Sequence, residues 1–275
     1  MSKSCILVPV DSTEQSIVGL SQSYNIAKLT ASRIVILTFD DGKPEEAKQR
    51  MEKLAAEARK QSGVLVETII KKGSTKEAYD EINKTADELQ PLFIVMGLVS
   101  KFTLKNIIGK NVFRMVRECN YPVITIKGKF HRNGCKNILL PLDLSKESRQ
   151  KVGKAIDLAK MFGSNIRAVS ILTTSDEIFE NKLISYGNQA WKLIKEQGVA
   201  SSIKTLRGKN IPKMVIDYAH EIEADLIMIM SEDHETFAQV LLGTNAQHII
   251  SKCDIPVLSL RPKMLKDTST FAMPY

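Results

Sequence analysis

One segment of the sequence recurs about 132 residues further along the chain, and this repeat constrains the fold more than any other feature. Residues 5–11 read Cys-Ile-Leu-Val-Pro-Val-Asp, and residues 137–143 read Asn-Ile-Leu-Leu-Pro-Leu-Asp. Residues 119–123 (Cys-Asn-Tyr-Pro-Val) return as residues 253–257 (Cys-Asp-Ile-Pro-Val). Solenoids repeat every 20 to 50 residues or so, whereas a unit this long is a whole domain. The sequence therefore predicts two copies of one domain.

The length of 275 residues suits two domains of ordinary size. We expect the first domain at residues 1–129 and the second at residues 136–263, followed by a tail at residues 264–275. Residues 128–136 are polar and contain two glycines, which predicts a linker. Each domain is long enough to bury its own hydrophobic core.

Composition and charge narrow the functional classes. Apolar residues make up 43% of the chain and charged residues 25%, as in ordinary globular proteins. The net charge of +8 is spread over both halves, and aromatic residues make up only 6%. Nucleic-acid binders more often carry a basic stripe interleaved with aromatics, so we expect no nucleic-acid partner. The apolar runs are too short to span a bilayer, so we expect no membrane association.

The four cysteines indicate a reducing compartment. None forms a Cys-x-x-Cys pair, and their spacing matches no zinc pattern. Cys119 and Cys253 occupy equivalent positions of the repeat beside an apolar strand, which predicts packing residues. Residues 1–5 run directly into the first strand and do not resemble a signal peptide. These features predict a cytoplasmic protein.

Strands and helices alternate through both halves in the pattern of a parallel α/β sheet. Continuous apolar runs predict strands that are buried on both faces, and amphipathic runs predict the helices between them. In the first half we expect strands at 5–10, 33–39, 64–70, 92–96 and 123–127, and helices at 13–29, 44–61, 75–89 and 109–118. In the second half we expect strands at 138–142, 165–172, 201–206, 226–230 and 257–260, and helices at 145–162, 176–197, 211–223 and 244–252. Right-handed crossovers make each half a doubly wound domain with a five-stranded parallel sheet.

The ends of two strands carry the candidate functional residues. Ligands of open parallel sheets bind at the carboxyl ends of strands where the strand order reverses. The first strand of each half ends at Asp11 or Asp143. The fourth strand ends at Met96-Gly97 in the first half and, by the repeat, at Met230-Ser231 in the second. A glycine then opens the next helix, and Pro-Val precedes the last strand.

Together, these motifs resemble the universal stress protein family, over about residues 4–128 and 136–262. The resemblance implies an adenine nucleotide alpha hydrolase-like fold with a five-stranded parallel sheet, and a tandem arrangement. Nucleotide-binding members carry Gly, two residues, Gly, nine residues and Gly-(Ser/Thr). In those members the aspartate after the first strand lies near the adenosine, and the glycines and helix start hold the phosphates. The implied ligand is therefore ATP or another adenine nucleotide.

The resemblance implies one set of nucleotide-binding residues in each half. These are Pro9, Val10, Asp11, Thr38, Met96, Gly97, Ser100, Gly109, Lys110 and Asn111 in the first half, and Asp143, Ser231, Gly243, Thr244 and Asn245 in the second. The two aspartates are the best candidates because both halves keep them at a strand end. Either aspartate could instead cap the following helix, and the two roles can coexist.

Both halves depart from the nucleotide motif. In the first half, Ser100 replaces the second glycine, only eight residues precede Gly109, and Lys110 stands at the Ser/Thr position. In the second half both early glycines are missing, but residues 243–244 match as Gly-Thr. Glu232, Asp233 and Glu235 also place negative charge in the second loop.

Charge favours the first half as the nucleotide site. Lys101, Lys105 and Lys110 surround its predicted loop, and no carboxylate enters it. In the second half, each carboxylate about 4 Å from a phosphate would cost about 4 kcal/mol at an effective dielectric near 20. A bound Mg²⁺ between Asp233 and the phosphates could offset that repulsion.

The sequence leaves three functions open. The first is a stress-response protein that binds adenine nucleotide in at least one domain, with no catalytic residues. The second is an interaction module without nucleotide, and the third is a slow Mg²⁺-dependent ATP hydrolase that uses Asp233. Other catalytic patterns fail: there is no P-loop, no dinucleotide fingerprint and no positioned Ser-His-Asp set.

The fifth strand of each half, at residues 123–126 and 257–260, would end its sheet at an exposed edge. Unpaired edges promote association, so we expect the two strands to pair with each other. The family resemblance implies the same pairing, because universal stress proteins dimerise through this strand. The chain would then form an internal pseudo-dimer, and a homodimer of chains is a further prediction.

Overall fold

The structure is a computed structural model that describes residues 4–11, 13–73, 78–98, 107–128, 134–230 and 244–261, without the side chains of residues 107–111, 146, 147 and 244. The first half contains β1 (Cys5–Pro9), α1 (Glu14–Leu29), β2 (Arg33–Phe39), α2 (Pro44–Ser62), β3 (Val66–Lys71), α3 (Ala78–Leu89), β4 (Phe93–Gly97), α4 (Ile107–Glu118) and β5 (Val123–Ile126). The second half contains β6 (Asn137–Leu142), α5 (Lys146–Phe162), β7 (Asn165–Leu172), α6 (Glu177–Glu196), β8 (Ser201–Arg207), α7 (Ile211–Glu221), β9 (Leu226–Met230), α8 (Thr244–Lys252) and β10 (Val257–Leu260).

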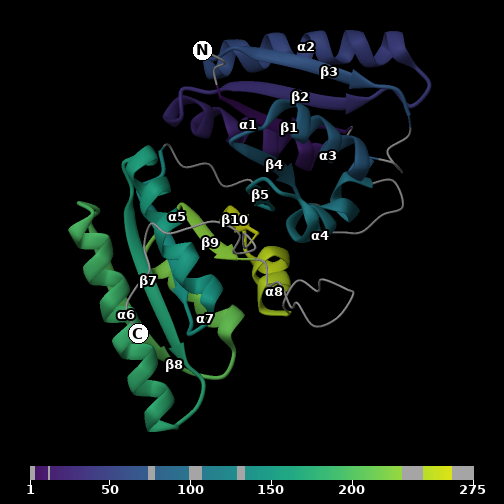
Figure 1. Ribbon diagram of the computed structural model, residues 1–275. Coiled ribbons are helices and arrows are strands. Elements are labelled where there is room, and N and C mark those ends of the chain that lie inside the picture. The colour runs from purple at the N-terminus through teal and green to yellow at the C-terminus, as the bar shows by residue number, and fades with distance from the viewer. Residues whose placement is uncertain are drawn as a thin grey trace.

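The strands of the described chain form one sheet in the order β3-β2-β1-β4-β5-β10-β9-β6-β7-β8. All neighbours within each half are parallel, as the sequence predicted. β5 and β10 pair antiparallel, with Val257 opposite Thr125 and Ser259 opposite Val123. Figure 1 shows these two strands between the two halves. The predicted internal pairing of the fifth strands is therefore confirmed.

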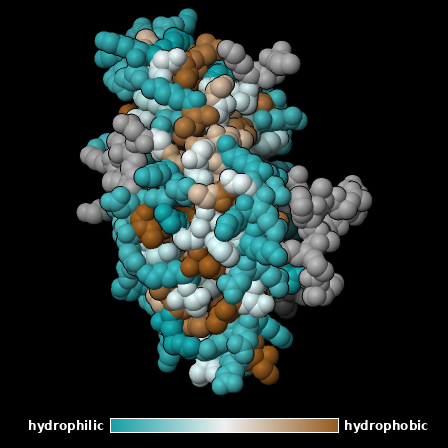
Figure 2. Space-filling view, turned by 90° about the vertical axis from the view of Figure 1, so that its left-hand side faces the viewer, coloured by the Kyte–Doolittle hydropathy of each residue, from teal (hydrophilic) through white to brown (hydrophobic). Residues whose placement is uncertain are grey.

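Two hydrophobic clusters, one on each side of the sheet, form the core. One cluster lies between the sheet and α3, α4, α7 and α8, and the other lies between the sheet and α1, α2, α5 and α6. Strand residues alternate between the clusters, so that Ile6 faces one and Leu7 the other. Cys119 and Cys253 are buried in the first cluster, which confirms the prediction that they are packing residues. On the face seen in Figure 2, the hydrophobic side chains at the surface lie in separate patches among hydrophilic ones.

Local sequence signals fix the ends of several helices. The Thr13 side chain accepts a hydrogen bond from the backbone N–H of Ser16 and caps α1, and Ser145 caps α5 in the same way through Ser148. Side-chain acceptors at this position satisfy backbone donors that the first helical turn leaves free. At the other end of α2, Gly63 has a φ of 68°, a left-handed conformation that glycine adopts without strain.

The sheet register defines which residues of the two halves are equivalent. Phe93 of β4 lies beside Ile6, and Leu226 of β9 lies beside Ile138. Gly97, at the end of β4, therefore corresponds to Met230, at the end of β9. This corrects the sequence-based alignment, which matched Met96-Gly97 with Met230-Ser231. One residue is inserted between the first and fourth strands of the second half, and the sequence repeat alone did not place it.

Candidate functional site

A cavity of about 510 Å³ lies in the second half at the carboxyl ends of β6, β7 and β9. From β6 the chain continues to β7 on one side, and β9 later returns on the other, so the strand order reverses here. Helices α6, α7 and α8 contribute mainly apolar walls, such as those of Phe179, Val215 and Ile249. The described polar residues that line it are Asp143, Ser145, Ser148, Lys151, Thr173 and Asn245. A mainly apolar cavity with a few polar groups is the usual form of a small-molecule site.

The two strand-end aspartates have the same local role in both halves. Asp11 Oδ1 accepts a hydrogen bond from the backbone N–H of Thr13 at 2.8 Å, and Asp143 Oδ1 accepts one from Ser145 at 2.8 Å. Each aspartate therefore orders the turn that leads into the helix, while the next Thr or Ser is the cap. The alternative that the aspartates themselves cap the helices is corrected by this arrangement.

Lys151 of α5 is the most unusual polar residue of the cavity, because its side chain is only 5% exposed. Burial lowers the pKa of Lys151, and the negative charge of Asp143 partly opposes this effect. Among the residues that the structure describes, none accepts a hydrogen bond from the Lys151 ammonium, and no carboxylate lies within ion-pair distance of it.

The first half has glycines where the second half has Lys151 and Met230. The caps and turns of α1 and α5 are 132 residues apart, so Gly19 corresponds to Lys151. A Cβ atom on Gly97 would lie 2.1 Å from the carbonyl oxygen of Gln15, and a Cβ on Gly19 would lie 3.1 Å from the Gly97 nitrogen. Helix α1 therefore lies directly on the end of β4. In the second half, the Lys151 and Met230 side chains line the cavity instead.

Buried side chains occupy the equivalent place in the first half, and two of them are larger than their counterparts. Phe39, Val112 and Met115 take the places of Ile171, Ala246 and Ile249, and all three are at most 3% exposed. Tyr79, Met96 and Leu98 belong to the same buried cluster. The described side chains therefore pack together at the position that charge alone favoured for a nucleotide.

Asp11 lines a different, smaller cavity. This cavity of about 300 Å³ lies between α1 and α2, and Val10, Ile17, Arg50 and Leu54 are among its other lining residues.

Thr38 is buried beside this region, and its hydroxyl donates a hydrogen bond to the Val10 carbonyl oxygen at 2.8 Å. Pro9 and Val10 are buried as well. Pro9, Val10 and Thr38 are therefore buried in the packing around the end of β1.

The structure describes some of the remaining predicted site residues in full, some by their backbone alone and some not at all. Ser100, Ser231 and Gly243 lie outside the described residues, and only the backbone is described for Gly109, Lys110, Asn111 and Thr244. Helix α4 begins at Ile107 rather than at the predicted residue 109, so Gly109 and Lys110 lie within its first turn. Asn245 is exposed at the first turn of α8 and lines the large cavity.

Several cavity residues were missed by the sequence reasoning, above all Lys151 and Met230. Comparing the two copies residue by residue would have found Lys151, because a helix position that holds glycine in one copy holds lysine in the other. Met230 required the sheet register.

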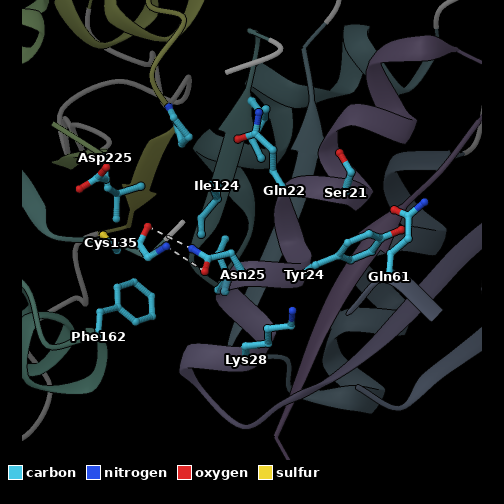
Figure 3. Close-up of a pocket in the computed structure, with 15 residues that line it drawn as sticks. Ser21, Gln22, Tyr24, Asn25, Lys28, Gln61, Ile124, Cys135, Phe162 and Asp225 are labelled. Atoms are coloured by element: carbon cyan, nitrogen blue, oxygen red, sulfur yellow. Dashed lines mark hydrogen bonds between the residues drawn. The ribbon is translucent and has the colours of Figure 1, made fainter. Parts of the chain in front are cut away.

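A further cavity, of about 430 Å³, lies between the two halves. Figure 3 shows Tyr24, Asn25 and Lys28 on one side and Cys135, Phe162 and Asp225 on the other. The Asn25 side chain donates to the carbonyl oxygen of Gly134 and accepts from its N–H, both at 3.0 Å.

The polar groups around this cavity between the halves have structural roles. The Asp225 carboxylate accepts hydrogen bonds from the backbone N–H groups of Lys136 and Asn137, at 2.7 and 2.9 Å. Burial raises the pKa of Tyr24 to about 12, so its hydroxyl stays protonated at neutral pH. The cavity is therefore a crevice where the predicted linker is anchored.

The described residues contain neither a metal-binding cluster nor a membrane-spanning helix. Within them, no cluster of three or more His, Cys, Asp and Glu residues could hold a metal ion. The sequence predicts that Asp233 could hold a Mg²⁺ ion. The acidic run around it, at residues 232–235, lies outside the described residues. None of the described helices is long and apolar enough to cross a membrane.

Comparisons with known proteins cover both the second half and the whole chain. Residues 134–261 match the universal stress protein family. A universal stress protein of Methanocaldococcus jannaschii is 28% identical over 148 residues, which are 47% of this chain and 86% of the relative. A putative universal stress protein of Staphylococcus saprophyticus is 25% identical over 138 residues, which are 45% of this chain and 83% of the relative.

Two solved structures match nearly the full length. A universal stress protein from Archaeoglobus fulgidus superimposes with a TM-score of 0.76 at 18% identity, over 95% of this chain and 99% of that one. A putative universal stress protein from Pseudomonas aeruginosa has a TM-score of 0.69 at 18% identity, over 95% of this chain and 94% of that one.

Two parallel α/β halves joined through their fifth strands define a tandem, doubly wound α/β protein. Full-length structural matches confirm this fold class. The second half, residues 134–261, matches the universal stress protein family, in agreement with the resemblance seen in the sequence, and the full-length structural matches show that the whole chain has the fold of a tandem universal stress protein.

Proposed function

We propose that this protein is a ligand-responsive stress protein whose second half binds an adenine nucleotide. The cavity at the carboxyl ends of β6 and β9 carries this proposal. It lies where the strand order reverses, and its volume of about 510 Å³ falls in the range of small-molecule sites. Asp143, the predicted nucleoside contact, lines it.

Helix α8 supports a place for phosphate at the same cavity. Asn245 and Ala246, in the first turn of α8, line the cavity, so the amino end of the helix lies beside it. The backbone N–H groups of a first helical turn have no partners within the helix and carry partial positive charge, which favours bound anions. The nucleoside would lie near Asp143 and the phosphates near α8.

The first half supports a second role, as an interaction or scaffold module. Its equivalent position is occupied by Phe39, Met96 and Met115, all buried, and its β5 strand holds the second half through β10. We propose that the first half provides the dimer-like frame and the second half provides the ligand site. A homodimer of chains, the Mg²⁺ ion, the slow hydrolase and the cytoplasmic location stay predictions.

The test compares two aspartates that each accept a backbone N–H of the turn but line different cavities. We expect ATP to raise the melting temperature of the wild type, since ligand at 100 times its Kd adds about 2.7 kcal/mol to the free energy of unfolding. Asp143→Ala should weaken this shift, while Asp11→Ala should leave it unchanged. Both variants lose a backbone turn hydrogen bond, and Asp11→Ala also loses the bond from the Thr13 hydroxyl, so without ATP Asp11→Ala should lose at least as much stability as Asp143→Ala. No shift at millimolar ATP, with and without Mg²⁺, would leave the interaction module as the function.

A further inference from the structure

Lys151 is a lysine that the fold does not need at its position. Its side chain is 5% exposed, although lysines are among the residues least often fully buried unless they are paired. In the other copy of the domain, Gly19 occupies the same helical position and allows α1 to lie directly on β4. The same helix, cap and sheet therefore form with no side chain there.

No described residue forms an ion pair with the Lys151 ammonium. Asp143 is the one described acidic group whose charge acts on Lys151, but it is solvent-exposed and beyond ion-pair distance, and its Oδ1 accepts the Ser145 N–H. The other described polar groups of the cavity are neutral side chains of Ser, Thr and Asn. Apolar walls, including Met230 and Ile229, make up most of the remainder.

An isolated charge in such a place is costly, because few water molecules or dipoles replace its hydration. The cost falls when an opposite charge enters the cavity, and the interaction between the two is strong because the surroundings are apolar. A ligand with an anionic group would gain this interaction, whereas a neutral ligand would leave the ammonium without a partner.

We infer that Lys151 binds the anionic group of the ligand in the second-half cavity and selects phosphorylated nucleosides over neutral ones. This inference rests on the proposed function and assigns it a ligand class and a specificity residue. Because one lysine provides one positive charge and the walls are mainly apolar, the matching ligand has an apolar or aromatic body and one phosphate. A nucleoside monophosphate has this form.

The experiment compares adenosine with AMP, which differ only in the phosphate. Isothermal titration calorimetry of the full-length wild type should show AMP binding at least about tenfold tighter than adenosine, since a charged hydrogen bond contributes about tenfold to hundredfold in affinity. Lys151→Met, which keeps the length of the side chain but not the charge, should lose most of this preference. Its affinity for adenosine should stay within about twofold of the wild type.

Lys154→Met is the matched control, because Lys154 is exposed on the same helix and receives the same substitution. It should bind AMP like the wild type, which excludes an effect of net charge. Lys151→Arg tests the charge in the opposite direction and should retain part of the AMP preference.

Melting temperature without ligand is the second measurement, and it does not depend on any nucleotide. A buried ammonium without a bound anion destabilises the ligand-free protein. Lys151→Met should therefore melt at a higher temperature than the wild type. A lower melting temperature would show that Lys151 already has a partner in the chain, such as Glu232 or Asp233, and would overturn the inference.

The two proposals fail in different ways. If Lys151→Met binds AMP as tightly as the wild type, the specificity role of Lys151 is wrong while the nucleotide site stands. If the wild type binds neither adenosine nor AMP nor ATP, the proposed function is wrong, and this inference falls with it.

Discussion

The two halves share a sheet order and hydrogen-bonded turns, yet they differ at the place where a ligand would bind. In the first half, Gly19 and Gly97 let α1 touch the end of β4, and large side chains such as Phe39 are buried beyond it. In the second half, Lys151 and Met230 replace the glycines, and a cavity of about 510 Å³ remains.

This difference separates what a duplicated backbone conserves from what its side chains decide. The strand-end aspartate and its turn are the same in both copies. A site, however, also needs unfilled space and a group that interacts with the ligand. Beyond the fourth strand, the described residues of the second half provide both, whereas those of the first half are buried there, although charge counted along the sequence favoured the first.

The largest expected effect comes from giving the first half the residue of the second. Gly97→Met should lower the free energy of unfolding by about 3 kcal/mol or more, because its Cβ would lie 2.1 Å from the Gln15 carbonyl oxygen. Met230→Gly is the reverse control and should cost only about 1 kcal/mol, since it shortens a partly exposed side chain on a cavity wall. Equal losses in urea unfolding would contradict the difference between the two interfaces.

A phenylalanine at two equivalent helix positions tests whether the space is real. Val112→Phe should cost about 2 kcal/mol, because Val112 is fully buried in a packed cluster. Ala246→Phe should cost less than about 1 kcal/mol, because its ring can enter the cavity, and it should abolish nucleotide binding. Denaturant unfolding of both variants gives the comparison. A larger loss for Ala246→Phe would mean that the cavity is closed in solution.

The pH dependence of stability isolates the charge of Lys151. Burial lowers the Lys151 pKa below its ordinary 10.5, so between these two values the unfolded chain binds more protons than the folded one. The free energy of unfolding of the wild type therefore rises with pH through this range. Lys151→Met lacks this dependence and should be more stable than the wild type at neutral pH. Its advantage should vanish as the pH approaches 10.5, and an advantage that grows with pH would contradict the assignment.

The smallest effect should be the same in both halves. Thr13→Ala and Ser145→Ala each remove the side chain that caps a helix, and each should cost about 1 kcal/mol in thermal unfolding. Equal costs would show that the copies differ at the cavity and not at the helix starts. A much larger cost in one half would mean that its cap has an additional role.

Much of the fold was predictable because burial on both faces leaves a continuous apolar run. The bounds of β2, β7, β9 and β10 agree with the predicted ranges residue for residue. The pairing of β5 with β10, though not its antiparallel direction, followed from the need to cover two exposed edges. The start of α4 was misplaced by two residues, since Gly109 looked like a helix opening but lies within the first turn.

The candidate site was only partly predictable. Asp143 and Asn245 were found because motifs place them at the end of a strand and the start of a helix, and both line the cavity. Met230 was assigned to the wrong equivalent position, since the sequence repeat does not show where between two strands a residue is inserted. The packing that fills the first half could not be predicted from loop charges, because these carry no information about volume.

The sequence by itself determined that the chain has two similar halves, the order of their strands and helices, and the aspartate that follows each first strand. These features depend on local periodicity and on repetition along the chain. Only the tertiary structure decided which copy keeps a cavity and places Lys151 in it. Those features depend on the volumes and contacts of residues far apart in the chain, and packing of that kind is not written in any single segment.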